Sequence, residues 1–295
     1  MRIAACQYLI ERFADWDSYS EHLTTLCRQV AEEGATLLVL PEYASMAITG
    51  LQDDHLCGDL HASIAAMQPM LGRWFAFWEK LANELGVYIT PGSIPVKDWD
   101  GHYRNRTWLF GPEGSLGSQD KLIMTRFERE EWNIAGGAGL RVFRLPECTL
   151  GILICYDNEF PQLARQLTEM GADIILAPSC TDTEAGYYRV RVGCQARALE
   201  NQIAVVQSPI VGTANWSPAV DINVGRAGVF VPPDYGMPAN GVLGESLSLM
   251  PDTSTWLMVD LDLEALREVR KTGQVMTRRD WPEQFDPARC FPLDI

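Results

Sequence analysis

The sequence has few basic residues, and this absence limits its possible partners. Lysine and arginine together number 24, against 39 aspartate and glutamate residues, so the formal net charge is −15. The densest basic groups are only residues 189–191 and 278–279. A nucleic-acid backbone would be repelled by most of such a surface, so we expect no nucleic-acid partner.

Long hydrophobic runs and phosphate-binding loops are also missing. No stretch of 18 or more apolar residues occurs, and the N-terminal apolar run ends at Glu11, too early for a signal peptide. The sequence therefore predicts a cytoplasmic protein that does not enter a membrane. No glycine-rich strand-to-helix loop is present, which argues against a phosphate-binding protein.

Cysteine and histidine are not spaced for metal binding. The eight cysteines contain no C-x-x-C pair, which argues against a zinc site and against a disulfide framework. Only four histidines occur, and the nearest to Cys155 in sequence is His102. A cysteine–histidine pair formed in space stays open but is not favoured, and we expect neither a metal nor a cofactor.

Apolar segments alternate with amphipathic ones along most of the chain, which predicts an α/β fold. The expected strands are residues 2–8, 36–40, 87–96, 141–145, 150–154, 173–177 and 203–208, with a hairpin over 103–110 and 115–121. The expected helices are residues 16–33, 64–85, 160–170 and 187–201. No linker interrupts this pattern, so we predict one domain over residues 1–272, followed by a polar tail over 273–295.

The chain also contains two similar segments. GATLLVLPE (34–42) and GADIILAPS (171–179) share a Gly-Ala pair, a polar residue, an apolar strand and a proline. Chance similarity between short apolar strands is common. If the repeat is real, two similar layers would pack their sheets together with helices outside. The two proline-terminated strand ends would then open on one edge, where a site should lie.

Cys155 is the best candidate for a nucleophile. It lies in LGILICYDNEFPQL (150–163), where an apolar strand stops and a helix begins near Pro161. The positive end of that helix should lower the pKa of the thiol and favour the thiolate. The alternative is a small buried residue at the end of a strand.

Two further residues could complete a site. Glu42 follows a buried strand, where apolar surroundings would raise the pKa of a carboxyl group into the range useful for a general base. Lys121 ends the hairpin and could stabilise an oxyanion together with the backbone N–H of Tyr156. Each residue could equally be an ordinary charged group at the end of a strand.

The three motifs together resemble the nitrilase superfamily of carbon–nitrogen hydrolases over almost the whole chain. Glu after LLVLP, Lys after GPEG and Cys in GILICYDNEFP occur in that family's order, and YRNRTWLFGPEG (103–114) and QARALENQIAVV (195–206) are also similar. The resemblance implies a four-layer α-β-β-α sandwich with two similar halves. It also implies Glu42 as base, Lys121 as oxyanion-stabilising cation and Cys155 as nucleophile.

A second glutamate is expected from the resemblance, seven residues before a loop-ending glycine. Counting back from Gly137 selects Glu130, with Glu128 and Glu131 as competitors. Its expected role is to position Lys121 and the attacking water.

The sequence departs from the family's pattern near the substrate. GRAGVF (225–230) stands where many members have a Gly-x-Ser-x-Ile segment, so the resemblance does not define the substrate pocket. Tyr156-Asp157 is similar to amidase branches, whereas true nitrilases more often have Trp-Glu there. Glu159 stands where many amidases have arginine, so a substrate carboxylate is not obviously accommodated.

The resemblance therefore predicts a cofactor-free amidase that acts on a small amide through a cysteine thioester. Nitrile hydrolysis at the same site and a catalytically idle scaffold are the alternatives. Dicarboxylate ω-amides, N-carbamoyl compounds and aliphatic amides all remain open as substrates. We also expect a homodimer or larger assembly, in which the tail at 273–295 reaches a neighbouring subunit.

Overall fold

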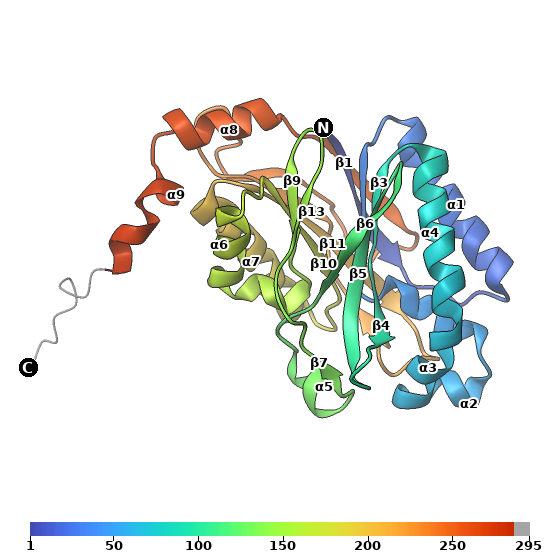
Figure 1. Cartoon of the computed structure of the whole chain (residues 1–295). Coiled ribbons are helices and arrows are strands. Elements are labelled where there is room, and N and C mark those ends of the chain that lie inside the picture. Colours follow the sequence, from blue (N-terminus) through green and yellow to red (C-terminus); the bar gives the residue numbers. More distant parts are fainter. Residues whose placement is uncertain (286–295) are drawn as a thin grey trace, which may run out of the picture.

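Two β-sheets pack face to face between outer layers of helices (Figure 1). The structure is a computed structural model that describes residues 1–285. Helices α1 (Trp16–Glu32) and α4 (Leu71–Leu85) cover one side, and α6 (Pro161–Glu169) and α7 (Glu184–Asn201) cover the other. The expected four-layer sandwich is confirmed.

The first sheet contains the N-terminal strands. Strands β1 (Arg2–Leu9), β2 (Leu37–Leu40) and β3 (Tyr88–Pro91) run parallel, and β15 (Thr255–Asp260) pairs antiparallel with β1. Strand β5 (Tyr103–Gly111) lies beside β3 in the sheet. It also pairs with three shorter strands: β4 (Ser93–Lys97), β6 (Gly114–Asp120) and β7 (Ile134–Ala135). The hairpin expected around GPEG is β5–β6.

The second sheet has the same parallel centre. Strands β9 (Thr149–Ile152), β10 (Ile174–Ser179) and β11 (Ala204–Thr213) run parallel, flanked by β8 (Val142–Arg144), β13 (Gly228–Phe230) and β14 (Val242–Glu245). Strand β12 (Ile222–Asn223) pairs with the end of β11. A short parallel pairing of Tyr8 and Leu9 with Ile210 and Val211 joins the two sheets.

Strands β2 and β10 hold the two similar sequence segments and pack against each other. Each is preceded by a glycine with a left-handed backbone, φ 90° at Gly34 and φ 100° at Gly171, where other residues would be strained. The side chains of β2 alternate between the core shared by the sheets and the core under α1 and α4. This burial on both faces explains why β2 has no polar positions.

The predicted helix over 64–85 is two helices. Helix α3 (Leu60–Met67) and α4 are separated by the short 3₁₀ turn η2 (Gln68–Met70), which contains Pro69. Proline lacks the N–H that a continuous helix requires, so it begins a new turn.

The predicted strand over 87–96 is also divided. Gly92, with φ 79°, separates β3 from β4, and a Cβ atom at this position would lie 1.9 Å from the backbone oxygen of Pro41. Only glycine allows this approach. The break in the strand therefore lies against the residue that precedes Glu42.

Several short helices were not expected. They are η1 (Ala44–Leu51), α2 (Asp54–Cys57), α5 (Arg126–Glu130) and α8 (Leu263–Thr272). Asp262 caps the start of α8, because its side chain accepts the N–H of Ala265, and the helix buries Leu263, Leu266 and Val269. Among the described residues, no helix combines the length and apolar composition needed to cross a bilayer.

The first part of the tail packs on its own chain. It contains α9 (Thr277–Asp280) and η4 (Trp281–Phe285). Gln202 donates to the oxygen of Val275 at 3.0 Å, and Arg278 donates to the oxygen of Thr168 at 2.9 Å. Residues 286–295 lie outside the described part, so a contact between the tail and a second subunit stays a prediction.

Candidate active site

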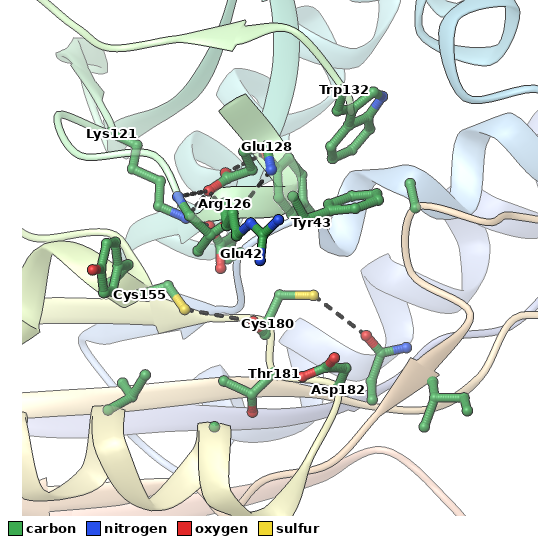
Figure 2. Close-up of a pocket in the computed structure, with 18 of the residues that line it drawn as sticks. Glu42, Tyr43, Lys121, Arg126, Glu128, Trp132, Cys155, Cys180, Thr181 and Asp182 are labelled. Carbon is green, nitrogen blue, oxygen red and sulfur yellow. Dashed lines mark hydrogen bonds and ion pairs between the residues drawn. The ribbon is translucent and has the colours of Figure 1, made fainter. Parts of the chain in front are cut away.

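The structure brings Glu42, Lys121 and Cys155 to one edge of the paired sheets (Figure 2). Glu42 follows β2, Lys121 follows β6, and Cys155 begins the 3₁₀ turn η3 (Cys155–Glu159) after β9. Their residues are 1%, 1% and 3% exposed, and all three line a cavity of about 710 Å³. Cys180, just after β10, also lines this cavity, as the repeated strand ends suggested.

Lys121 lies between two buried carboxylates. Its Nζ donates to Oε1 of Glu42 at 2.7 Å and to Oε2 of Glu128 at 2.6 Å. Asn105 on β5 also joins the two glutamates, because its Nδ2 donates to Oε1 of each, at 2.8 and 3.1 Å. The site therefore contains one cation between two glutamates, which an asparagine holds together.

The glutamate of the loop that contacts Lys121 is Glu128, and not Glu130 as expected from the sequence. Glu130 is exposed and pairs with Arg126 at 2.8 Å. Helix α5 begins with a capping box, in which the backbone N–H of Thr125 donates to Glu128 at 2.9 Å and Glu128 N–H donates back to Thr125 Oγ1. This box turns Glu128 towards Lys121, and the helical spacing carries Glu130 away from it. The T-x-x-E pattern was the signal in the sequence.

The two glutamates have opposite pKa shifts. Burial raises the pKa of Glu42 to about 7, although the charge of Lys121 lowers it. Burial would also raise the pKa of Glu128, but the charge of Lys121 and hydrogen bonds from Lys121, Tyr43 and Thr125 outweigh it, so its pKa is lowered. Glu128 is therefore ionised at neutral pH, whereas Glu42 can accept and release a proton.

Lys121 remains protonated despite its burial. Burial alone would lower its pKa, but the charges of Glu128 and Glu42 outweigh that effect and raise its pKa well above the usual value. A fixed ammonium group beside a nucleophile can stabilise negative charge, but it cannot itself attack a carbonyl carbon.

Cys155 does not have the lowered pKa that the sequence suggested. Burial and the nearby charge of Glu42 raise the pKa of its thiol well above the usual value. Helix α6 begins only at Pro161, after the intervening turn η3, so its positive end is not adjacent to the sulfur. The thiol donates to the backbone oxygen of Cys180 at 3.5 Å, and it must lose its proton to a base before it can attack.

The turn that holds Cys155 is strained and tightly supported. Cys155 has φ 48°, a left-handed conformation that costs on the order of 1–3 kcal/mol for such a residue. Asn158 donates to the oxygens of Leu153 at 2.7 Å and Cys155 at 3.3 Å. Gly193 of α7 allows the helix to approach, since a Cβ there would lie 2.8 Å from the oxygen of Asn158. No pattern in the sequence indicated this support.

Tyr43 is a further site residue that the sequence analysis missed. Its hydroxyl donates to Oε1 of Glu128 at 2.7 Å, and its ring packs against Trp132 with centroids 4.9 Å apart. It follows Glu42 directly and has φ 58°. Tyr43 therefore fixes Glu128 relative to the strand end that carries Glu42.

The outer wall of the cavity is mostly acidic. Its charged side chains are Arg126, Glu131, Glu159, Asp182, Arg189 and Asp221. Arg126 pairs with Glu130, and Arg189 pairs with Glu159 at 3.5 Å. Both arginines in the wall are therefore already paired. Across residues 1–285, no group of three or more His, Cys, Asp or Glu side chains is placed to hold a metal ion.

Comparison with known proteins identifies the family. The family model described as "Carbon-nitrogen hydrolase" matches residues 2–271. This chain belongs to the carbon–nitrogen hydrolase family. Its membership confirms the resemblance to the nitrilase superfamily and the expectation of an enzyme.

This carbon–nitrogen hydrolase has relatives of two kinds. It is 31% identical over 280 residues to "Probable hydrolase YhcX" of Bacillus subtilis, covering 95% of this chain but only 53% of that protein. It is 27% identical over 296 residues to "Omega-amidase NIT2" of Xenopus tropicalis, covering 94% of each. The chain thus spans about half of the first relative and nearly all of the second.

Solved structures share the fold of this carbon–nitrogen hydrolase. A carbon–nitrogen hydrolase from Helicobacter pylori superposes with TM-score 0.75 at 19% identity, covering 98% of this chain and 95% of that one. An amidase from Nesterenkonia sp. superposes with TM-score 0.71 at 23% identity, covering 95% and 96%.

Replacing the two competing glutamates should separate their roles in this hydrolase. Glu128→Gln should lower turnover at pH 7 by about tenfold or more, because Lys121 loses a charged hydrogen-bond partner. It should also shift the acid limb of the pH profile to lower pH, since the charge of Glu128 raises the pKa of Glu42.

Glu130→Gln is the matched control, because it removes one carboxylate from the same helix at the surface. Its ion pair is exposed, so we expect less than about a twofold change in turnover. Equal losses in the two variants would mean that Glu128 has no special role in the site.

Proposed function

We propose that this chain hydrolyses small amides through a thioester on Cys155, with Glu42 as the base and Lys121 as the oxyanion-stabilising cation. The observation that carries the proposal is the difference between the buried glutamates. Glu128 is held ionised against Lys121, whereas Glu42, with a pKa of about 7, can exchange a proton beside a thiol that requires a base.

Acylation would use each of these groups once. Glu42 takes the proton of the Cys155 thiol as the sulfur bonds to the amide carbonyl carbon. Lys121 and the backbone N–H of Tyr156 stabilise the negative oxygen of the tetrahedral intermediate. The carbon–nitrogen bond then breaks, and the departing nitrogen takes the proton from Glu42, so ammonia or an amine leaves and a thioester remains.

Deacylation would use the same base again. Glu42 accepts a proton from a water molecule, which attacks the thioester carbon. The carbon–sulfur bond breaks, and the sulfur recovers a proton from Glu42 as the carboxylic acid is released. The enzyme returns to its starting state with one water consumed, so no cofactor enters the balance.

The relatives support amide substrates and leave one alternative. The proteins named omega-amidase match almost the whole chain, which favours an amide. A protein named "Nitrilase" from Pyrococcus abyssi is 33% identical over 188 residues, or 63% of this chain. Nitrile hydrolysis by the same groups is therefore the second candidate. Family membership favours either activity over an idle scaffold.

Ammonia release from a small panel of compounds tests the proposal. The panel is succinamate, N-carbamoyl-β-alanine, propionamide and propionitrile, with Cys155→Ala protein as the blank. We expect ammonia from at least one of the first three. Intact-mass spectrometry during turnover should show an acyl adduct that maps to Cys155 and is removed by hydroxylamine.

Cys180→Ala is the matched control, because Cys180 is the other thiol that lines the cavity. The adduct should form in this variant as in the wild type. Ammonia from propionitrile alone would select the nitrile alternative. An adduct on Cys180, or undiminished ammonia release by the Cys155→Ala protein, would overturn the proposed mechanism.

A further inference from the structure

Asp157 connects the turn that carries the nucleophile to the segment that carries the cation. It lies in η3, two residues after Cys155, and is 1% exposed. Its Oδ1 accepts the backbone N–H of Ile123 at 2.8 Å, and its two oxygens accept the N–H of Leu122 at 3.2 and 3.1 Å. Leu122 and Ile123 directly follow Lys121.

The backbone of Lys121 is held from the other side by the first sheet and its adjoining loop. Its N–H donates to the oxygen of Asn105 on β5 at 2.9 Å, and its oxygen accepts the N–H of Gly137 at 2.8 Å. The lysine thus belongs to one sheet, whereas Cys155 follows a strand of the other. Asp157 makes hydrogen bonds across this boundary at the level of the reacting groups.

The charge of Asp157 is important for this connection. Burial raises its pKa to about 6, while the charge of Lys121 and the N–H groups of Ile123 and Leu122 lower it, and Glu128 raises it. The charge of Lys121 thus lowers the pKa of three buried carboxyl groups, those of Glu42, Glu128 and Asp157. A carboxylate accepts backbone N–H groups more strongly than a neutral carboxyl does, so protonation below pH 6 weakens the connection.

We propose that Asp157 is a positioning residue for the proposed amide hydrolysis. Its carboxylate fixes the backbone after Lys121 relative to the Cys155 turn, so that the ammonium group and the sulfur can act on one carbonyl group. It does not touch the reacting atoms. The inference rests on the proposed function, since it assigns Asp157 a part in that reaction.

Asp157→Asn tests the inference, because it keeps the shape and one oxygen acceptor but removes the charge. With the panel compound that the wild type hydrolyses fastest, we expect kcat to fall by about tenfold or more, since small displacements of catalytic groups are costly. KM should change by less than about threefold, because the contacts that bind the substrate and the transition state equally are not affected. Alkylation of Cys155 by iodoacetamide should stay within about twofold of the wild-type rate, because the sulfur and Glu42 are in place.

The pH profile separates positioning from simple structural support. In the wild type, kcat/KM should fall with two protonation steps as pH decreases, near 7 from Glu42 and near 6 from Asp157. The variant should retain only the step near 7, because asparagine does not titrate. Its melting temperature, measured in parallel, should stay close to the wild-type value.

Asp59→Asn is the matched control. Asp59 also accepts two backbone N–H groups, from His61 at 2.9 Å and Ala62 at 2.7 Å, but it is exposed at the start of α3 and does not line the cavity. This variant should keep the wild-type kcat and both pH steps.

Three outcomes would overturn the inference. The first is a wild-type kcat in Asp157→Asn, and the second is a pH profile of this variant that keeps both steps. The third is a parallel loss of turnover, alkylation rate and melting temperature in this variant, which would mean that Asp157 only supports the fold. If the Cys155→Ala blank is inactive while Asp157→Asn is normal, only this inference fails. If the blank is active, the proposed function fails with it.

Discussion

Replacing Glu42 with glutamine should lower turnover by about 10²- to 10⁴-fold, the usual range for loss of a general acid–base group. Glutamine keeps the shape of the side chain, and its oxygen can still accept the hydrogen bonds from Lys121 and Asn105. It cannot take a proton from the Cys155 thiol or return one to the leaving nitrogen. Both half-reactions should therefore slow.

The pH profile of the wild type gives the same test without a substitution. The ionised form of Glu42 is the base, and its pKa is about 7. Activity should therefore rise as pH increases through 7 and be lost as pH falls below it. Initial rates of ammonia release between pH 5 and 9 would measure this. A rate that stays constant down to pH 5 would assign the base to another group.

Replacing Lys121 with alanine should have an effect of comparable size. Loss of one oxyanion donor costs about 10²- to 10³-fold in kcat. A second loss follows because the charge of Lys121 lowers the pKa of Glu42. Without the lysine, that pKa rises further above 7, so less of the base is ionised at neutral pH. Lys121→Arg should also lose most of its turnover, since a planar, bulkier group replaces the ammonium.

The folding of the Lys121→Ala protein needs its own control. Removing one partner of a buried ion pair typically costs about 3–5 kcal/mol, so low activity could reflect an unstable protein. The double variant Lys121→Met, Glu128→Gln removes the cation and one of its carboxylate partners together. It should fold, allow alkylation of Cys155 by iodoacetamide and still lack turnover. Normal turnover in this variant, or a borohydride-trapped adduct on wild-type Lys121, would rule out the proposed role.

The fold could be predicted because its signals are local and repeated. Buried strands such as β2 have apolar residues on both faces, and α1 has regular apolar spacing, so the layers follow from the pattern. The two similar segments at 34–42 and 171–179 also predicted that a site would lie at the edge where their strands end. The break in the helix at Pro69 and the break in the strand at Gly92 could have been predicted from the sequence, since each residue has a backbone preference that interrupts an element.

The choice among the glutamates of the loop depended on recognising the short helix α5. Three glutamates, Glu128, Glu130 and Glu131, lie in or beside one short helix, and counting from a glycine cannot show which of them faces the lysine. The capping box at Thr125 decides this orientation. A one-turn helix inside a polar loop has too weak a period to be recognised from apolar spacing, so the T-x-x-E pattern was its signal in the sequence.

The pKa of Cys155 could not be predicted from its neighbours in sequence. The expected effect of a following helix is local, whereas burial by elements from the whole chain determines the actual shift. Glu42 comes from a different sheet and adds its charge. The sign of the shift is therefore a property of the assembled sandwich.

The raised pKa of Cys155 also has a consequence for the durability of the enzyme. Peroxide converts thiolates to sulfenic acid far faster than it converts thiols, so susceptibility follows thiolate character and exposure. Cys155 is 3% exposed and is held as a thiol until Glu42 accepts its proton. The resting enzyme should therefore be oxidised slowly in aerated solution, and its sulfur should become nucleophilic mainly when a carbonyl group is in place to receive it.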